Sequence, residues 1–242
     1  MSCKNQLMSF FIAILTVCFL TGCVDLSNNQ GGGYQVTDVE GTVITIAHKP
    51  QRILTVSAGT DELMLGLVEP ERMAAINESL ADREHTNIPW VCDRIPTVIP
   101  RSPSAEQIAA LHPDLVVVTP WMPRENIDAI RELNVPVLVC KSAATIEDIH
   151  DNIRLYAAAV GEVERGEKLV GMMEEKLAEI RAKVAEVPEE KKHRSIALIS
   201  IMVNYGGAGC TFDELCRCTD SINAKAAAGN RMGQEMTKEQ LV

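Results

Sequence analysis

Hydrophobic and polar residues keep a regular three- and four-residue spacing throughout residues 145–187. This spacing places the apolar side chains on one face of an α-helix. Gly161 interrupts the pattern, so we predict two helices in series. Thr145 and Asp148 form a capping signal at the start of the first helix, and Pro188 ends the second. The second helix would be about 39 Å long at 1.5 Å per residue.

Short apolar runs alternate with helix-like runs ahead of this helix pair. Apolar and polar residues alternate around Glu40 and Gly41, which predicts a β-hairpin. Residues 50–56 predict a strand, and two later runs are apolar without alternation, which is typical of buried strands. These are residues 115–118 and 135–140, and helices are expected at 60–67, 104–111 and 123–133. Strands that alternate with helices predict a parallel sheet with ligand sites at the strand ends.

The regions on either side of this pattern are less regular. Residues 77–103 contain several prolines and little periodicity, so we predict a long loop after a short strand at 72–76. After the helix pair the α/β pattern restarts with a strand at 195–203 and a glycine-rich loop at 204–209. Thr211 and Glu214 then predict a capped helix. The long helix therefore separates two α/β halves.

The end of the chain repeats motifs of its first half. Ser104-Ala105-Glu106-Gln107-Ile108 matches Thr237-Lys238-Glu239-Gln240-Leu241, and Thr60-Asp61-Glu62-Leu63 loosely matches Phe212-Asp213-Glu214-Leu215. We therefore expect an N-terminal α/β lobe at 34–144, inter-lobe helices at 145–187 and a second α/β lobe starting at 188–242. The second half stops soon after its repeated motif. We expect the second lobe to be incomplete and the chain to be a fragment.

Composition and charge narrow the class of partner. The chain has 242 residues, of which 46% are hydrophobic and 23% charged, which is typical of a globular protein. Its formal net charge is −10, and no basic patch is evident. Nucleic acid is therefore not expected as a partner, because binding it requires cations that neutralise phosphates.

The N-terminus has the features of an export signal. Lys4 precedes an almost wholly apolar run at 7–20, which is shorter than a membrane-spanning helix. The run ends in Leu20-Thr21-Gly22-Cys23, which resembles the lipobox of bacterial lipoproteins. The resemblance implies removal of residues 1–22 and a lipid on the Cys23 sulfur. The polar, glycine-rich residues 23–33 read as a flexible tether, so we expect a protein exported and anchored at the cell envelope.

Several motifs occur in one order along the chain. They are Val36-Thr37-Asp38 and Gly41 before Pro50-Gln51-Arg52-Ile53, Pro103-Ser104-Ala105-Glu106-Gln107-Ile108 before Pro113-Asp114-Leu115-Val116, Val135-Pro136-Val137, and Phe212-Asp213-Glu214-Leu215. Together they resemble the substrate-binding proteins of bacterial ABC importers for ferric siderophores, haem and cobalamin. The resemblance covers residues 34–242. It implies two α/β lobes with mostly parallel sheets, joined by a long rigid helix, with a ligand in the cleft between them.

The resemblance also implies partners. These are the permease and ATPase subunits of an importer, served by a monomeric binding protein. Glu106 and Glu239 occupy equivalent places in the two halves, and the family implies that such glutamates meet arginines on the two permease subunits. One alternative stays open, because a carboxylate in a first helical turn is stabilised by the aligned amides without any partner.

Aromatic residues make up only 4% of the chain, so their positions are informative. Trp90 lies in the predicted long loop, while Trp121 and Tyr205 directly follow predicted strands. These are places where cleft-lining residues of an α/β lobe belong. Arg101 precedes a helix cap and is a candidate cation for the same cleft. Tryptophans that anchor loops to the core, and an arginine that is simply solvated, remain alternatives.

The expected ligand is a large metal chelate or tetrapyrrole, namely a ferric siderophore, haem or cobalamin, and no permanent cofactor is expected. Trp121 should face Tyr205 and the Gly206-Gly207 loop, whose glycines would let backbone approach the ligand. A bare metal ion would need convergent histidines and carboxylates, and none is spaced for that purpose.

Catalytic motifs are absent from the sequence. The five histidines are scattered, and we expect His112 and His150 on the surface. Five cysteines beyond Cys23 receive no function: Cys92, Cys140, Cys210, Cys216 and Cys218. We therefore expect binding rather than catalysis. An exported enzyme that uses cysteine or histidine, a surface adhesin and a free-metal-ion binding protein are the alternatives.

Overall fold

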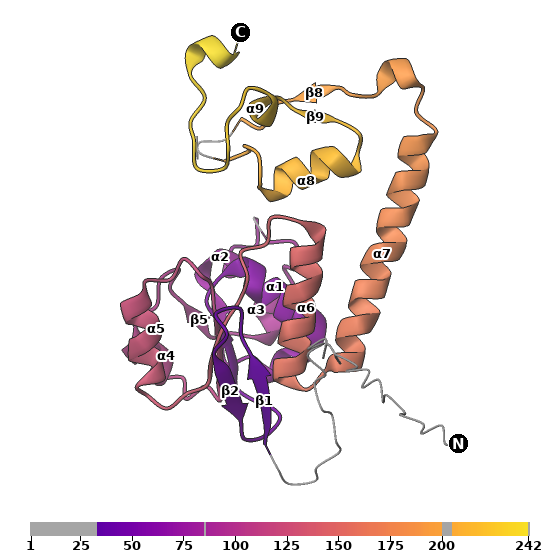
Figure 1. Ribbon diagram of the computed structural model, residues 1–242. Helices are drawn as coiled ribbons and strands as arrows, with labels where there is room; N and C mark the ends of the chain where they lie inside the picture. Colours follow the sequence, from indigo (N-terminus) through magenta and orange to yellow (C-terminus); the bar gives the residue numbers. More distant parts are fainter. Residues whose placement is uncertain (1–32, 85, 200–204, 242) are drawn as a thin grey trace, which may run out of the picture.

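The computed structural model describes residues 33–84, 86–199 and 205–241. Figure 1 shows an α/β lobe built from the first half, a long helix rising beside it, and a smaller second lobe at the far end of that helix. This is the arrangement that the sequence predicts. The proposed signal segment and the lipid-bearing Cys23 lie outside the described residues. Within the described ranges, no helix combines the length and the apolarity that crossing a bilayer would require.

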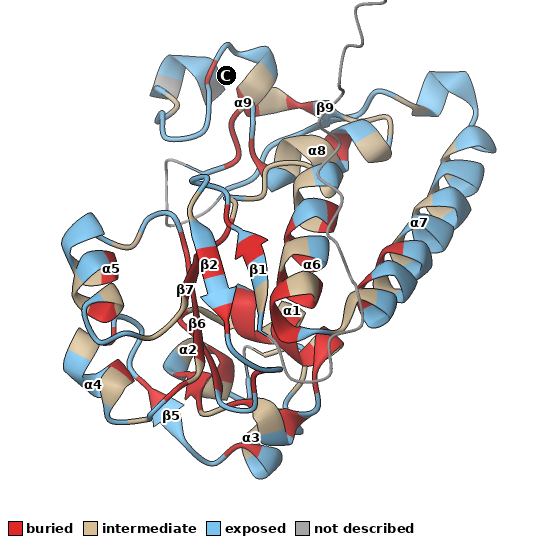
Figure 2. Cartoon of the chain, turned by 60° about the horizontal axis from the view of Figure 1, so that its bottom comes forward, coloured by how far each residue is buried: buried red, intermediate tan, exposed pale blue. Residues whose placement is uncertain are grey.

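The first lobe is built on a parallel sheet. A hairpin comes first, because β1 (Tyr34–Thr37) pairs antiparallel with β2 (Val43–Ile46), as the alternation predicts. The sheet then has the order β3-β6-β7, formed by β3 (Ile53–Thr55), β6 (Leu115–Val118) and β7 (Val137–Val139). Every residue of these three strands is buried. Figure 2 shows this buried centre in red.

Helices cover both faces of the sheet, which explains why its strands are apolar without alternation. Leu115 and Val117 pack into one hydrophobic cluster with residues of the hairpin, α1 (Ala58–Leu67) and α6 (Ile146–Val160). Val116 and Val118 pack into a second cluster with residues of α4 (Ala105–Ala109) and α5 (Arg124–Arg131). Successive strand residues point to opposite faces, so both faces must be apolar.

The stretch predicted as one long loop contains short elements instead. They are α2 (Glu78–Ala81), α3 (Val91–Arg94) and β5 (Val98–Ile99), preceded by the 3-10 turn η1 (Pro70–Arg72) and by β4 (Ile76–Asn77). Of the strand expected over 72–76, only Ile76 lies in a strand, although Met73 forms an isolated parallel bridge with Ile53. One-turn helices and two-residue strands are too short to produce a readable period. β4 and β5 pair in parallel and extend the α/β pattern.

The long helix matches its prediction closely. Thr145 caps α6 through a reciprocal pair of hydrogen bonds with Asp148, and Gly161 ends the helix in the left-handed conformation with a φ of 70°. α7 (Val163–Ala185) follows with 23 residues, about 35 Å at 1.5 Å per residue. Only Gly166 and Val170 of α7 are buried. Its base is therefore anchored on the first lobe, and most of its length is exposed.

The second lobe repeats the order strand, helix, strand, helix. Its elements are η2 (Glu189–Lys191), β8 (Ser195–Ile196), α8 (Thr211–Cys218), β9 (Ile222–Asn223), α9 (Ala224–Ala227) and η3 (Lys238–Leu241). β8 and β9 pair in parallel, like β3 and β6. The predicted strand at 195–203 is shorter than expected. Residues 197–199 are not strand, and 200–204 lie outside the described residues.

Two capping predictions have different outcomes. The repeated motif is confirmed in detail, because the backbone N–H groups of Ser104 and Thr237 each donate to a glutamine Oε1 three residues later, both at 2.9 Å. The Thr211 cap is wrong. Cys210 occupies the N-cap of α8 without a side-chain hydrogen bond, and Thr211 is the first helical residue.

Candidate functional site

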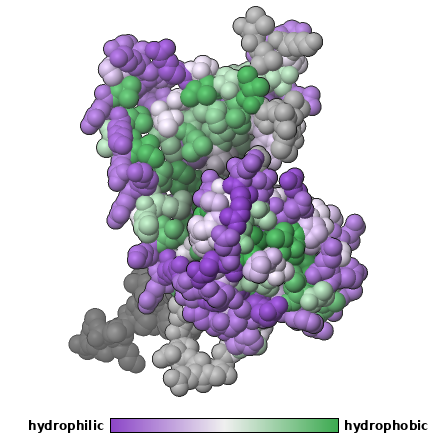
Figure 3. Space-filling model, turned by 180° about the vertical axis from the view of Figure 1, so that it is seen from behind, coloured by the Kyte–Doolittle hydropathy of each residue, from purple (hydrophilic) through white to green (hydrophobic). Residues whose placement is uncertain are grey.

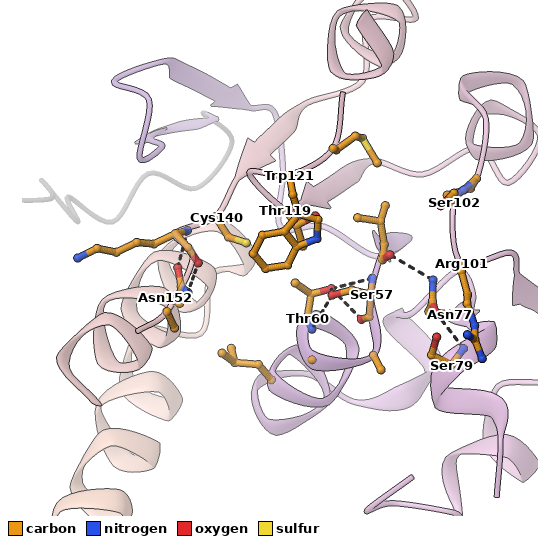
Figure 4. Close-up of a pocket in the computed structure, with 18 of the residues that line it drawn as sticks. Ser57, Thr60, Asn77, Ser79, Arg101, Ser102, Thr119, Trp121, Cys140 and Asn152 are labelled. Atoms are coloured by element: carbon orange, nitrogen blue, oxygen red, sulfur yellow. Dashed lines mark hydrogen bonds between the residues drawn. The ribbon is translucent and has the colours of Figure 1, made fainter. Parts of the chain in front are cut away.

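A hollow of about 750 Å³ opens at the carboxyl ends of the first lobe's strands (Figure 4). Its walls come from the loops that follow β3, β4, β5, β6 and β7, together with one face of α6. Parallel strands place their carboxyl ends at one edge of a sheet, so loops far apart in sequence converge there. The hollow therefore lies at the strand ends, where the sequence predicts a ligand site, and ligand binding there stays a prediction.

The floor of the hollow is rich in hydroxyl groups. Ser57 follows β3 in extended conformation and caps α1 by accepting from the backbone N–H of Thr60. The Ser57 backbone N–H donates to the Thr60 hydroxyl oxygen at 3.1 Å, and the two hydroxyl oxygens lie 2.9 Å apart. This capping box fixes the turn, so the two hydroxyls are held where they line the hollow.

Asn77 ties two walls of the hollow together. Its side-chain amide donates to the carbonyls of Val56 at 3.1 Å and Pro100 at 3.2 Å. Its backbone N–H donates to Asp61 at 2.6 Å, and the Thr55 hydroxyl donates to the same carboxyl group. Asp61 has no exposed surface. Burial raises the pKa of Asp61 to about 7, although the hydrogen bonds from Thr55 and Asn77 act in the opposite direction.

The α6 side of the hollow is held by an amide and an ion pair. Asn152 accepts from the backbone N–H of Lys141 at 2.9 Å and donates to its carbonyl at 2.8 Å. The Lys141 ammonium lies 2.6 Å from Asp148 and 3.0 Å from Asp151. The hydrogen bond from Lys141 is the largest cause that holds the pKa of Asp148 below its usual range. Burial raises the pKa of the Cys140 thiol, which also lines the hollow.

The lining of the hollow is free of acidic groups. Its residues include Arg101 and Lys141, but no aspartate, glutamate or histidine. Lys141 is neutralised by its two carboxylates, whereas among the described residues nothing forms a hydrogen bond or ion pair with the Arg101 guanidinium. A protein with a net charge of −10 thus presents an uncompensated cation at this opening. Such an arrangement attracts and orients an anion.

The predicted ligand residues divide into two groups. Arg101 and Trp121 both line the hollow, on different sides of it in Figure 4, and Trp121 is 67% exposed. Trp90 and Tyr205 are about half exposed and are not among the lining residues. Trp90 precedes α3, and the Tyr205 carbonyl accepts from Lys225 at 2.7 Å. Sequence reasoning missed a group of polar lining residues: Ser57, Thr60, Asn77, Ser79, Asn126 and Asn152.

The second lobe reaches the rim of the hollow. The Thr211 hydroxyl donates to the carbonyl of Ala143, a lining residue, at 3.2 Å. The loop before α8 therefore faces the hollow. The role expected for its glycines is wrong for Gly207, however, because a Cβ there would lie 2.3 Å from the Arg231 carbonyl carbon. Gly207 is buried against the chain's own backbone, and Gly206 is buried with a φ of +85°.

The surface position expected for His150 is also wrong. His150 is only 2% exposed, and its Nδ1 lies 3.6 Å from Glu147 and from Glu174. It points from α6 toward α7, so the helix pair buries it. Its Nε2 has no hydrogen-bond partner among the described residues. His112 is exposed, as predicted. Over the described residues, no three histidine, cysteine, aspartate or glutamate side chains gather as a metal site would require.

Both candidate docking glutamates lie on the surface. Glu106 accepts from the Ser104 hydroxyl at 2.7 Å, and this bond lowers the pKa of Glu106 below its ordinary value. The pKa of Glu239 is also lowered, by a backbone N–H and by Thr237. The two carboxylates therefore sit at matching helix starts, in agreement with the repeat. Their contact with a permease stays a prediction.

Comparison with known proteins gives a consistent family. The family described as "Periplasmic binding protein" matches residues 54–231. YhfQ of Bacillus subtilis, a lipoprotein named for ABC transporter substrate binding, is 26% identical over 182 residues, which are 72% of this chain and 56% of YhfQ. The "Probable siderophore-binding lipoprotein YfiY" of the same organism is 22% identical over 191 residues, which are 76% of this chain and 57% of YfiY. The chain thus spans little more than half the length of these curated relatives.

The fold is also found among solved structures. The crystal structure of the heme binding protein HmuT superimposes with a TM-score of 0.69 and 23% identity, and the match covers 89% of this chain and 71% of HmuT. At this identity the likeness concerns the fold alone.

Proposed function

The chain belongs to the periplasmic binding protein family, and we propose that it captures an anionic metal chelate outside the cytoplasm for an ABC importer. One observation carries the ligand class. The hollow at the strand ends is lined by Arg101, which has no hydrogen-bond or ion-pair partner among the described residues, and by an exposed tryptophan, Trp121, while no acidic side chain lines it. An aromatic surface and a cation together suit a bulky, flat or lobed anion.

The size and chemistry of the hollow favour a chelate over a bare ion. Its volume of about 750 Å³ is within the range of small-molecule sites. A bare metal ion would need protein ligands, whereas a chelate brings its own donors and needs only hydrogen bonds, charge and apolar contact. Hydroxyl and amide groups of Ser57, Thr60 and Asn126 lie along the wall and are suited to oxygen-rich chelators.

Between a ferric siderophore and haem, we favour the siderophore. The lining offers no histidine or exposed tyrosine that could ligate haem iron. Tyr156 does line the hollow, but it is only 1% exposed, and burial raises the pKa of its hydroxyl far above the ordinary range. YfiY is named as siderophore-binding, which agrees with this choice, whereas HmuT is named as heme binding. Haem therefore belongs in the test as the principal competitor.

The test is a titration of the chain with four probes, in which binding is measured by the quenching of tryptophan fluorescence. The probes are a ferric tris-catecholate, a ferric tris-hydroxamate, haem and cyanocobalamin. The Trp90→Phe variant leaves Trp121 as the only tryptophan, so its quenching reports on the hollow alone. We expect saturable quenching by the anionic tris-catecholate. Saturation by haem alone, or by free zinc or iron with no response to any chelate, would contradict the proposal.

Partners and location follow from the same proposal. The loaded protein would deliver its ligand to a permease driven by ATPase subunits, and Glu106 and Glu239 would register the two lobes on it. A lipid on Cys23 would hold the protein at the outer side of the cytoplasmic membrane or at the cell surface. The names of YhfQ and YfiY as lipoproteins support this location. We propose a monomer, because one pair of lobes suffices to enclose the ligand.

A further inference from the structure

Each lobe contains a hydrogen-bonded pair of one aspartate and one asparagine, behind the loop that faces the other lobe. In the first lobe the pair is Asp61 of α1 and Asn77, the last residue of β4. In the second lobe Asp213 of α8 and Asn223, the last residue of β9, occupy the corresponding places. Both asparagines cap the short helix that follows, α2 in one lobe and α9 in the other. The repeat of sequence is thus also a repeat of contacts.

We propose that Asp61 and Asn77 form a positioning pair that fixes the shape of the hollow. We propose that Asp213 and Asn223 are its counterpart in the second lobe. The importance of either pair for ligand binding rests on the function proposed above.

The first pair connects the wall that follows β3 with the wall that follows β5. The Asp61 carboxyl group accepts hydrogen bonds from the Asn77 backbone N–H, at 2.6 Å, and from the Thr55 hydroxyl. These bonds fix the position of Asn77. The Asn77 side-chain amide in turn donates hydrogen bonds to the carbonyls of Val56 and Pro100. Val56 begins the loop that carries Ser57 and Thr60, and Pro100 immediately precedes Arg101. Loss of this bridge would release the cation and the hydroxyls from their mutual positions.

The second pair fixes the loop that reaches the rim. The Asn223 side chain donates to Asp213 at 3.0 Å and to the Gly207 carbonyl at 3.5 Å. Asp213 also accepts from the Gly209 backbone N–H at 3.3 Å. These bonds hold the turn directly before Thr211, whose hydroxyl contacts Ala143 at the edge of the hollow. The partners differ in detail between the lobes, but in each an aspartate and an asparagine fix the facing loop.

The test separates positioning from general stability. Asn77→Ser retains a good helix cap for α2, but the shorter side chain cannot reach both carbonyls. Tyr34→Phe is the matched control. It removes a partly buried hydrogen bond, in which the Tyr34 hydroxyl donates to the Ala159 carbonyl at 2.7 Å, and Tyr34 does not line the hollow. Amide hydrogen exchange of the full chain is measured for both variants and for Asp61→Asn.

We expect Asn77→Ser to speed exchange at least tenfold in peptides that contain 56–60 and 101–103, while the sheet strands keep their protection. Asp61→Asn should have a smaller effect at the same peptides, because an amide oxygen can still accept from Asn77. Tyr34→Phe should leave those peptides unchanged. Equal or uniform effects of Asn77→Ser and Tyr34→Phe across the lobe would overturn the positioning role.

A second measurement links the pair to the ligand. Affinity for the ferric tris-catecholate should fall at least tenfold in Asn77→Ser and stay unchanged in Tyr34→Phe. Unchanged affinity in Asn77→Ser would overturn the proposal's relevance to binding. If the wild-type chain binds no chelate at all, the proposed function fails, whereas hydrogen exchange still decides whether the pair positions the loops.

Discussion

Asp61 combines complete burial with a proton that it holds unusually tightly. Its pKa rises to about 7, against about 3.9 in an unfolded chain, and the main cause is desolvation. The folded state therefore binds the proton more strongly than the unfolded state. Its contribution to stability is complete below about pH 4 and is lost as the pH rises toward 7. Within this window the free energy of unfolding should fall by at most about 1.4 kcal/mol per pH unit from this group.

The corresponding prediction concerns Asp61→Asn. Asparagine has the same shape, accepts from the Asn77 N–H through its oxygen and donates to the Thr55 hydroxyl through its nitrogen. We expect a flatter dependence of the unfolding free energy on pH between 4 and 7 than in wild type, measured by urea titration at several pH values. Asp148 does not affect this comparison. Its pKa is lowered, so its contribution to the free energy of unfolding is lost only at more acidic pH. An unchanged slope in the variant would show that Asp61 does not titrate in this range.

Arg101 allows a prediction about ligand charge. Arg101→Gln removes the unpaired cation of the hollow, and a charge-assisted hydrogen bond contributes about 1.5–3 kcal/mol. Affinity for the ferric tris-catecholate should therefore fall about tenfold or more, whereas an uncharged ferric hydroxamate should lose far less. Arg94→Gln is the matched control, because Arg94 is paired with Glu71 and does not line the hollow. Equal losses for both chelates would contradict a role in charge recognition.

Trp121 carries a separate prediction. Stacking on an aromatic ring contributes about 1 kcal/mol beyond the area buried, so Trp121→Ala should weaken chelate binding about tenfold. Trp90→Ala is the control, because Trp90 is not among the lining residues. Isothermal titration of both variants measures the difference. If Trp121→Ala binds the chelate with wild-type affinity, Trp121 does not contribute to the binding site.

At the scale of residues, the sequence predicts two of the residues that line the hollow. Arg101 and Trp121 could be predicted because each follows or precedes a recognisable element, and that position places them at a strand end. Asn77 and Asn152 could not, because their roles depend on contacts with Pro100 and Lys141, which are distant in sequence or set by the register of α6. His150 was misplaced because burial on α6 depends on where α7 packs.

At the scale of elements, α6 and α7 pack closely against each other where Gly166 faces Ala157. A Cβ on Gly166 would lie only 2.5 Å from the Ala157 Cβ, so the glycine lets the two helices approach closely. The same stretch of α7 is anchored to α1, since the Arg165 guanidinium donates to the Gly66 carbonyl at 3.0 Å. This base is where α7 is fixed to the first lobe.

A pair of glycine substitutions tests this base. Gly166→Val should lower the free energy of unfolding by about 1–3 kcal/mol, because overpacking forces the helices apart. Gly171→Ala is the control on the same helix, where nothing lies within 4 Å of the new Cβ. Alanine there should raise stability by up to about 1 kcal/mol through helix propensity. Denaturant unfolding measures both, and a neutral Gly166→Val would mean that the helices are not tightly packed.

Elements long enough to show a period were predicted well, and shorter ones were not. The hairpin, β6, β7, α6 and α7 each follow a hydrophobic pattern that their packing requires. β4 and β5 are two residues each and depend on pairing with each other. The apolar run at 195–203 predicts a longer strand than β8, because an apolar run alone cannot show where pairing stops. Ile196 and Leu198 are in fact about 40% exposed.

At the scale of the whole molecule, the repeat was the most informative feature of the sequence. It predicted two lobes of like architecture and placed Glu106 and Glu239 at matching helix starts. It could not predict which second-lobe side chains remain on the surface. Figure 3 shows hydrophobic side chains gathered over the second lobe, where Ile196, Ile199 and Ile222 are exposed.

The docking prediction belongs to this scale. Glu106→Ala combined with Glu239→Ala should leave chelate affinity intact and lower uptake by cells that carry the importer. Matched charges register a complex more than they strengthen it, so each single variant should have a smaller effect. Glu125→Ala, an exposed glutamate in the first turn of α5, is the control. Uptake equal to wild type in the double variant would refute docking through this pair.

The shape of α7 has a mechanical consequence. A rod held at one end turns a small rotation into a larger displacement at the other, and α7 is packed on the first lobe from Gly166 to Glu174 while its later turns are largely exposed. The distance from Glu174 to Ala185 is about 16 Å at 1.5 Å per residue, so a tilt of about 5° would carry the far end about 1.4 Å. Such a swing exceeds what the 3.2 Å hydrogen bond between Thr211 and Ala143 tolerates. A few degrees of lever motion would therefore suffice to break this contact between the lobes, with no unfolding of either one.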